Sequence, residues 1–191
     1  MTKINLFFYG CSGAGKSTAI KYLIKKYKDC YLNISYTTRN KREGEIDGKD
    51  YYFISKDNFR EKIRNGFFIE YAEFKGNLYG TPLNDHVNRN IRIFDLETKG
   101  ILFYKEYFKS NRNEAIFIYL SATREIVESR LKLRNLDEIE FNRRAGTFLE
   151  AQKFAKTFCF DFLIDTGNDI KENQAELDFI IKNLLFTCHD P

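Results

Sequence analysis

The chain has no apolar run long enough to cross a membrane. A spanning helix needs roughly 18 or more consecutive apolar residues, and the runs here, such as INLFFY at residues 4–9, are much shorter. The run at residues 4–9 leads directly into a glycine-rich loop, with no small-residue cleavage site after it. We therefore expect a buried strand at this place, and neither a signal peptide nor a membrane anchor.

Cysteine and histidine are also scarce, and neither forms a recognisable pattern. The cysteines are Cys11, Cys30, Cys159 and Cys188. Without pair spacing they argue against a disulfide framework and against a zinc site, and they favour reduced thiols in a cytoplasmic protein. The two histidines, His86 and His189, have no partner pattern, so we assign them no role.

Linkers rich in proline, serine or glycine are absent, and so are internal repeats. With 191 residues and only two prolines, the chain fits one domain with smaller inserted lobes. The net charge is +4, and basic residues are interleaved with acidic ones along most of the chain. This charge does not indicate a nucleic-acid partner, but it suits an enzyme whose ligands are anionic.

The sequence does contain a regular alternation of strand and helix patterns. Short apolar runs predict strands at residues 4–9, 31–35, 91–95, 115–120 and 160–164. Apolar residues at helical spacing predict helices at 16–27, after Gly100, at 124–157 and near the C-terminus. Such alternation predicts an α/β fold, in which a parallel sheet is covered by helices on both faces.

Residues 36–81 interrupt this alternation. They are rich in tyrosine, phenylalanine, glycine and charge, with strand-like pieces at 51–54 and 67–74. We expect a small mixed lobe with antiparallel strands here. Pro82, which follows it, is expected at the first position of a helix.

The segment GCSGAGKS, Gly10 to Ser17, matches the phosphate-binding pattern G-x-x-x-x-G-K-[ST] in full. Its glycines let successive backbone N–H groups point at phosphates, and the following helix adds positive potential. Lys16 can bridge the outer phosphates, and the Ser17 hydroxyl can ligate Mg²⁺. Asp95, at the end of IRIFD, is a candidate for the same metal ion, directly or through water. It could instead cap the next segment.

The interrupting lobe carries polar residues that together suit one kind of ligand. They are Ser35, Arg39, Arg42, Tyr51, Glu70, Tyr79 and Thr81. Two arginines can each donate two hydrogen bonds to a phosphate dianion, and tyrosine hydroxyls can donate to its remaining oxygens. A carboxylate such as Glu70 can accept from the N1–H and 2-amino groups of guanine, and a hydroxyl such as Ser35 or Thr81 can donate to O6. Taken singly, each residue has an ordinary structural explanation, and two arginines on a polar loop are usually solvated surface.

The order of these residues resembles the guanylate kinase family. The pattern S-x-T-T-R-x-x-R-x-G-E-x-D-G-x-D-Y-x-F, followed by F-I-E-x-A-E-x-x-G-N-x-Y-G-T, stands after a matching GxSGAGKST loop. The resemblance implies a P-loop NTPase fold with three layers, in which ATP phosphorylates GMP (and dGMP) with Mg²⁺. It implies a core at 1–34, 84–124 and 148–191, a GMP-binding lobe at 35–83 and a helical lid at 125–147.

The resemblance also distributes roles among residues. ATP would be bound by Gly10, Cys11, Ser12, Gly13, Ala14, Gly15, Lys16, Ser17 and Thr18. Guanine would be read by Ser35, Glu70 and Thr81, with a contact from Glu97. The GMP phosphate would be held by Arg39, Arg42, Tyr51 and Tyr79.

Three arginines of the expected lid complete the predicted catalytic set. Arg130 and Arg134 are four residues apart, so we expect them on one helix face. Arg144 is preferred over its neighbour Arg143 because of the NRRA alignment. In the resembling family such arginines close onto the ATP phosphates, which need positive charge during transfer. The predicted catalytic residues are therefore Lys16, Arg39, Arg130, Arg134 and Arg144.

Some positions depart from the family pattern, mainly around the donor. Glu97 replaces the aspartate that is usual in the family, and Lys99 replaces a common glutamine. Ser121-Ala122 replaces a frequent proline pair, and Asp165-Thr166 replaces Asn-Asp. Two alternatives stay open: a non-catalytic guanylate-kinase-like interaction domain, and a related P-loop kinase of another small phosphorylated acceptor. The expected partners are the small molecules ATP and GMP, with no nucleic acid or membrane, for a monomer or homodimer in the cytoplasm.

Overall fold

A computed structural model describes residues 3–187 except 75, 84–86 and 111–113, so His86, Cys188 and His189 lie outside the described residues. The chain divides into two compact units. The core unit comprises Met1–Leu32 and Arg89–Pro191, and the small unit is the continuous stretch Asn33–Asn88. Among the described residues, no helix combines the length and apolar character that crossing a membrane requires.

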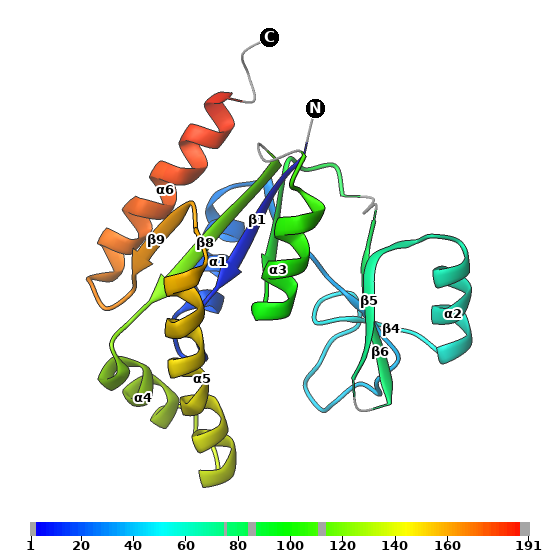
Figure 1. Ribbon diagram of the computed structural model, residues 1–191, viewed down its shortest axis with the longest axis horizontal. Coiled ribbons are helices and arrows are strands. Elements are labelled where there is room, and N and C mark those ends of the chain that lie inside the picture. The colour runs from blue at the N-terminus through cyan, green and yellow to red at the C-terminus, as the bar shows by residue number, and fades with distance from the viewer. Residues whose placement is uncertain (1–2, 75, 84–86, 111–113, 188–191) are drawn as a thin grey trace. The chain divides into compact units, whose positions relative to one another are not determined.

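The core unit is built on a five-stranded parallel sheet with strand order β2-β7-β1-β8-β9 (Figure 1). The strands are β1 (Ile4–Tyr9), β2 (Cys30–Leu32), β7 (Ile91–Asp95), β8 (Ala115–Ser121) and β9 (Phe162–Asp165). Every residue of β1 is buried, as expected for the central strand of a covered parallel sheet. The α/β fold predicted from the sequence is confirmed.

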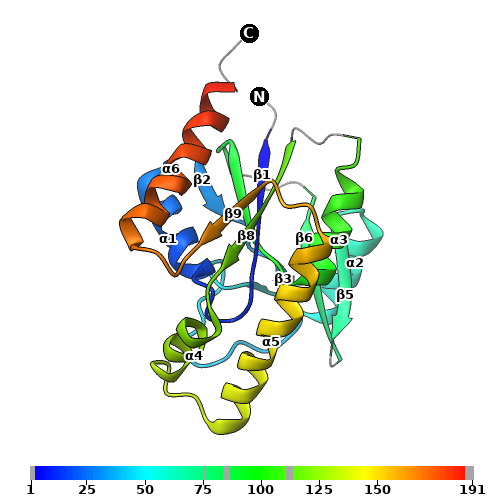
Figure 2. The same cartoon turned by 60° about the vertical axis from the view of Figure 1, so that its left-hand side comes forward.

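Helices cover both faces of this sheet. The helices of the core unit are α1 (Lys16–Lys26), α3 (Thr98–Tyr107), α4 (Arg124–Lys132), α5 (Glu138–Thr157) and α6 (Ile170–Thr187). Helices α1 and α6 lie together on one face, and α3 and α5 lie on the other (Figures 1 and 2). On the second face the Phe7 ring stacks on Tyr104 of α3 at 4.7 Å, and Tyr9 packs edge-on against Phe154 of α5 at 5.1 Å.

The small unit has its own four-stranded mixed sheet with order β4-β3-β6-β5. Its elements are β3 (Tyr36–Thr37), β4 (Tyr52–Phe53), α2 (Lys56–Arg64), β5 (Phe68–Phe74) and β6 (Asn77–Pro82). Strand β3 pairs in parallel with β4 and antiparallel with β6, and β5 pairs antiparallel with β6. Phe59 of α2 is fully buried and stacks on Phe68 at 4.5 Å, which gives this unit an aromatic core of its own.

Several expected elements differ from the structure. Pro82 is the last residue of β6 and not the first residue of a helix. The strand expected at 31–35 ends at Leu32. The helix expected at 124–157 is two helices, because Asn135 takes a left-handed φ of 50° and the Asp137 side chain caps a new N-terminus by accepting from Glu140 N.

Candidate active site

The phosphate-binding loop connects β1 to α1 and depends on its glycines. Gly13 and Gly15 have φ values of 89° and 91°, which other residues rarely adopt. At Gly10 the constraint is space, since a Cβ atom would lie 2.5 Å from the Leu120 carbonyl oxygen of β8. The loop then enters α1 at Lys16, so its backbone N–H groups gather at a helix N-terminus, where anions are favoured.

Lys16 and Asp95 lie beside one another at this loop. The Lys16 ammonium donates to the Gly10 carbonyl at 2.7 Å and to Cys11 at 3.3 Å, and it is 3.8 Å from Asp95 Oδ1. Asp95 ends β7, the neighbour of β1. Desolvation raises the pKa of Asp95, and the Lys16 charge opposes that rise. The loop thus combines one cation and one carboxylate at the carboxyl ends of adjacent strands.

A cavity of about 200 Å³ lies at this loop within the core unit. Its lining residues are Cys11, Ser12, Gly13, Ala14, Gly15, Lys16, Ser17, Thr18, Asp95, Arg134 and Arg144. The structure therefore brings together eight consecutive residues of the predicted ATP-binding set, the Ser17 and Asp95 pair predicted for the metal, and two of the three lid arginines.

Arg130 is placed differently from the other two lid arginines. It lies on α4, whereas Arg134 follows the end of that helix, so the two do not share a helix face as expected. The Arg130 guanidinium donates to the Gly13 carbonyl at 3.3 Å, to Thr166 Oγ1 at 3.0 Å and to the Thr166 carbonyl at 2.6 Å. Arg130 therefore supports the loop from outside the lining of the cavity.

Thr166, which accepts from Arg130, also contacts the phosphate-binding loop directly. It is buried, and its hydroxyl lies 3.0 Å from the Ala14 carbonyl and 2.9 Å from the Ser121 carbonyl. A hydroxyl has one hydrogen, so it donates to one of these oxygens while accepting from Arg130. The segment after β9, the end of β8 and the phosphate-binding loop are thereby joined at one side chain.

Glu140 holds the two adjacent arginines of α5. Its carboxylate accepts from Arg143 Nε and Nη2 and from Arg144 Nε, each at 2.7 Å. These arginines, Arg143 first, lower the pKa of Glu140 to about 2. Arg144 lines the cavity and Arg143 is exposed, so the terminal nitrogens of Arg144 are the ones available there.

Helix α5 also contacts the loop through Thr147. Its hydroxyl accepts from the Ser12 backbone N–H at 3.1 Å and donates to the Arg144 carbonyl at 2.7 Å. The turn of α5 that carries Arg144 is thereby fastened to the loop, which gives this part of the expected lid a defined register against the cavity.

In the small unit, Glu70 and Thr81 face each other across paired strands. They are register partners in β5 and β6, and the Thr81 hydroxyl donates to Glu70 Oε1 at 2.7 Å. Because Thr81 uses its only hydrogen in this bond, its oxygen can serve a ligand only as an acceptor. Ser35 Oγ accepts from Asn33 at 3.4 Å and keeps its own hydrogen for donation. Of the two hydroxyls expected to reach guanine O6, Ser35 is the one with this capacity.

The other predicted small-unit residues gather around Arg39. Its guanidinium lies 5.6 Å from the centre of the Tyr51 ring and 5.6 Å from that of Phe53, and the Tyr51 and Tyr79 rings are 6.0 Å apart. Burial raises the pKa of Tyr51, so its hydroxyl stays protonated and can donate to an anion. Glu97, the remaining predicted GMP contact, belongs to the core unit, where it precedes α3 at the N-cap position.

A sequence profile of the family described as Guanylate kinase matches residues 3–184. The chain belongs to the guanylate kinase family. It is 37% identical over 179 residues to a guanylate kinase of Prochlorococcus marinus subsp. pastoris, covering 91% of this chain and 94% of that protein. It is also 37% identical over 177 residues to one from Wolinella succinogenes, covering 90% of this chain and 80% of that protein.

The fold is also similar to that of a solved guanylate kinase. The crystal structure of guanylate kinase from Anaplasma phagocytophilum superposes with a TM-score of 0.61, at 21% identity, covering 99% of this chain and 87% of that one. Membership of the guanylate kinase family thus rests on the sequence profile and the relatives, and the solved structure adds agreement in fold.

Three residues of this guanylate kinase family member stand out in the structure without having been singled out from the sequence. They are Glu45, Thr147 and Thr166. Glu45 stands inside the quoted R-x-G-E motif, so a signal was present. Thr166 was noted only as a departure from the family pattern, and Thr147 had no signal, because its partner is a backbone N–H that sequence patterns do not reveal.

Proposed function

We propose that this protein transfers the γ-phosphoryl group of ATP to GMP, giving ADP and GDP. The observation that carries the donor half is the cavity in which Lys16, Arg134 and Arg144 converge on the phosphate-binding loop. The observation that carries the acceptor half is the Glu70–Thr81 pair. Membership of the guanylate kinase family supports joining the two halves in one reaction.

On the donor side, the transferred group passes through a state whose charge lies on its outer oxygens, so the protein contributes mainly position and positive charge. A phosphate oxygen of GMP forms a bond to the γ-phosphorus. The bond from that phosphorus to the bridging oxygen breaks, and ADP leaves with the electron pair. Lys16 and the loop N–H groups hold the phosphates, while Arg134 and Arg144 supply further charge at the same cavity. Arg130 is assigned the supporting role that its contacts favour.

The acceptor is selected by matching donors with acceptors. The second oxygen of Glu70 and the Thr81 oxygen both accept, which suits the N1–H and 2-amino groups of guanine. Adenine presents an unprotonated N1 at this edge, so two acceptors would face each other and stay unpaired. Ser35 donates to O6, and Glu97 is proposed as an added contact. The phosphate of GMP is assigned to Arg39, Arg42, Tyr51 and Tyr79.

The residues at the cavity fit a magnesium ion bound together with ATP. Ser17 and Asp95 offer the hard oxygen donors that Mg²⁺ prefers. The described residues contain no group of three or more histidine, cysteine, aspartate or glutamate side chains that could hold a metal ion, so phosphate oxygens and water would complete the shell. Magnesium supplies charge neutralisation at the β- and γ-phosphates when bound.

The proposal includes the division of labour implied by the family. The lobe at 35–83 binds GMP, the segment 125–147 acts as a lid, and the remaining residues form the core. We also propose a cytoplasmic monomer or homodimer whose partners are these small molecules. The scattered cysteines, three of which are free thiols in the described chain, support the reducing location.

An ADP-release assay with ATP, Mg²⁺ and a panel of nucleoside monophosphates tests the proposal. We expect turnover with GMP and dGMP, and little with AMP, CMP or UMP. A Lys16→Ala preparation run in parallel detects any contaminating kinase. Equal rates with AMP, or ADP release that does not depend on an acceptor, would contradict the proposed reaction.

A further inference from the structure

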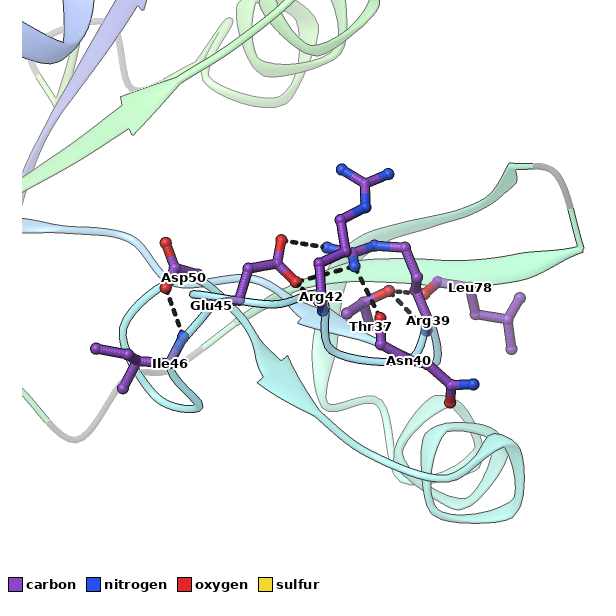
Figure 3. A network of polar contacts seen from close by, with 8 residues as sticks. All are labelled: Thr37, Arg39, Asn40, Arg42, Glu45, Ile46, Asp50 and Leu78. Carbon is purple, nitrogen blue, oxygen red and sulfur yellow. Dashed lines mark hydrogen bonds and ion pairs between the residues drawn. The ribbon is translucent and has the colours of Figure 1, made fainter.

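Glu45 forms the centre of a polar network in the small unit (Figure 3). Its two carboxylate oxygens accept from the two terminal nitrogens of Arg39, at 2.9 Å to Nη1 and 2.7 Å to Nη2. The same carboxylate accepts from the backbone N–H of Arg42 at 2.7 Å. One side chain therefore contacts both arginines assigned to the GMP phosphate, one through its guanidinium and the other through its backbone.

The contacts of Arg39 determine which of its donors remain for a ligand. Besides Glu45, Arg39 Nη1 donates to the Asn40 carbonyl at 2.8 Å, so both hydrogens of Nη1 are used. One hydrogen of Nη2 and the hydrogen of Nε are not used by Glu45 or Asn40, and these lie along one edge of the planar group. The Tyr79 side chain also interacts with this guanidinium. The rings of Tyr51 and Phe53 limit its remaining freedom. Arg39 thus presents a single edge, in a fixed direction, to any anion it binds.

Arg42 is held in a complementary way. Its backbone is fixed by Glu45, and its side chain is exposed and extends away from the Glu45 carboxylate (Figure 3). Glu45 therefore does not neutralise the Arg42 guanidinium as it does that of Arg39. Arg42 supplies an exposed positive charge, and Arg39 supplies an oriented pair of donors.

We propose that Glu45 is a positioning residue for the phosphate of GMP. It orients the Arg39 edge and anchors the Arg39–Arg42 loop, and it touches no substrate itself. This inference rests on the proposed function, because it concerns how the acceptor phosphate is bound. Arg39 and Arg42 hold the pKa of Glu45 at about 2, so the carboxylate stays charged across the pH range of ordinary assays.

Two effects of Glu45 oppose each other, and they predict opposite results. As an anion near the phosphate site, Glu45 reduces the net positive charge, so removing its charge would tighten GMP if charge alone decided affinity. As the group that orients Arg39, its removal frees a flexible side chain and weakens GMP. The bidentate geometry and the side-chain exposures of only 14% for Arg39 and 19% for Glu45 favour orientation as the larger effect.

The test compares Glu45→Gln with Glu43→Gln, a change of the same charge at an exposed residue two positions away. Binding of GMP, guanosine and ATP is measured for both variants and for the wild type. We expect Glu45→Gln to weaken GMP about tenfold or more, with guanosine and ATP changed less than about twofold, and Glu43→Gln to resemble the wild type. Unchanged or tighter GMP binding in Glu45→Gln overturns the positioning role. Loss of guanosine binding also overturns it, because Glu45 would then be needed for the fold itself.

A double-mutant cycle with Arg39 separates positioning from an independent effect. If Glu45 acts through Arg39, Glu45→Gln weakens GMP much less in an Arg39→Ala background than in the wild type. Equal factors in both backgrounds would overturn the inference. A wild-type protein that does not bind GMP overturns the proposed function and this inference together. A wild type that binds GMP while Glu45→Gln binds it equally well overturns only the role of Glu45.

Discussion

The hydroxyl of Thr81 donates to the carboxylate of Glu70 at 2.7 Å, across strands that are held in register by backbone pairing. The bond orients the Glu70 side chain and turns the Thr81 oxygen into an acceptor. Two acceptors side by side suit a ligand with two adjacent donors, and guanine is such a ligand.

Glu70→Gln should weaken GMP binding by about 1–3 kcal/mol and leave ATP binding unchanged, because the amide would present donors to the donors of guanine. The Michaelis constants for the two substrates provide the measurement. Glu73→Gln, at an exposed position of the same strand, serves as the matched control. An unchanged constant for GMP would remove Glu70 from base recognition.

Lys16→Ala should lower the turnover number by at least about 10²–10³-fold, as expected when one fixed positive donor at the transferring group is removed. Binding of GMP should survive, since the predicted GMP phosphate and base contacts of the small unit do not include Lys16. Lys21→Ala, on an exposed position of α1, is the control. Normal turnover of the Lys16 variant would contradict the role assigned to the phosphate-binding loop.

Thr166→Val should reduce the free energy of unfolding by about 1–3 kcal/mol, because buried partners of the hydroxyl lose their hydrogen bond. The Thr166 side chain contacts Arg130 and the carbonyls of Ala14 and Ser121. Urea denaturation is the measurement. Thr157→Val removes an exposed hydroxyl whose hydrogen bond in the described part of the chain is to the Phe154 carbonyl of the same helix, so its change should stay within about 0.5 kcal/mol. Similar losses of unfolding free energy in the two variants would refute the claim that the Thr166 hydroxyl stabilises the fold through its buried hydrogen bonds.

Gly80→Ala and Gly146→Ala should have opposite effects on stability. A Cβ atom at Gly80 would lie 2.9 Å from ring atoms of both Phe59 and Phe68, and such overpacking costs about 1–3 kcal/mol. At Gly146, inside α5, nothing lies within 4 Å, so alanine should stabilise the helix by about 0.5–1 kcal/mol. Thermal unfolding of the two variants checks the signs, and a stabilising Gly80→Ala would show that the small aromatic core is loosely packed.

Cys11 should react slowly with thiol reagents although it lies in the glycine-rich phosphate-binding loop and lines the cavity. It is buried, and burial raises its pKa, so at any given pH less of it is thiolate than for an ordinary cysteine. Cys159 is exposed. With iodoacetamide at pH 8, peptide mass spectrometry should show Cys159 alkylated at least about tenfold faster than Cys11. Equal rates would contradict the burial of the Cys11 thiol.

Elements whose sequence signal lies within a few neighbouring residues could be predicted from the sequence. The apolar run at 4–9, the glycines after it and the helix from Lys16 correspond to β1, the loop and α1, because each depends on neighbouring residues alone. Helix α2 was not predicted, since its apolar face consists of only Phe59 and Ile63 among nine mainly charged residues, and only Phe59 of these is buried. Its clearest local sign is the Ser55 side chain, which caps the helix by accepting from Asn58 N.

The division of the segment 124–157 and the partners of its arginines were harder to foresee. The break contains neither glycine nor proline. Only Asn135 and the D-x-x-E spacing of Asp137 and Glu140 point to it. An arginine looks the same in a sequence whether it faces a phosphate or a protein carbonyl. For that reason Arg130, bonded to Gly13 and Thr166, could not be told apart from Arg144, which lines the cavity.

The continuity of the small unit has a consequence for engineering. The chain leaves the core unit after Leu32 and returns at Arg89. These points adjoin β2 and β7, which are hydrogen-bonded neighbours, and Arg89 donates to the Cys30 carbonyl at 3.1 Å. A replacement insert from a relative has only these two nearby attachment points to satisfy. The proposed GMP-binding lobe is therefore one continuous insert, and chimeras joined at Leu32 and Arg89 would test how far this insert determines the choice of acceptor.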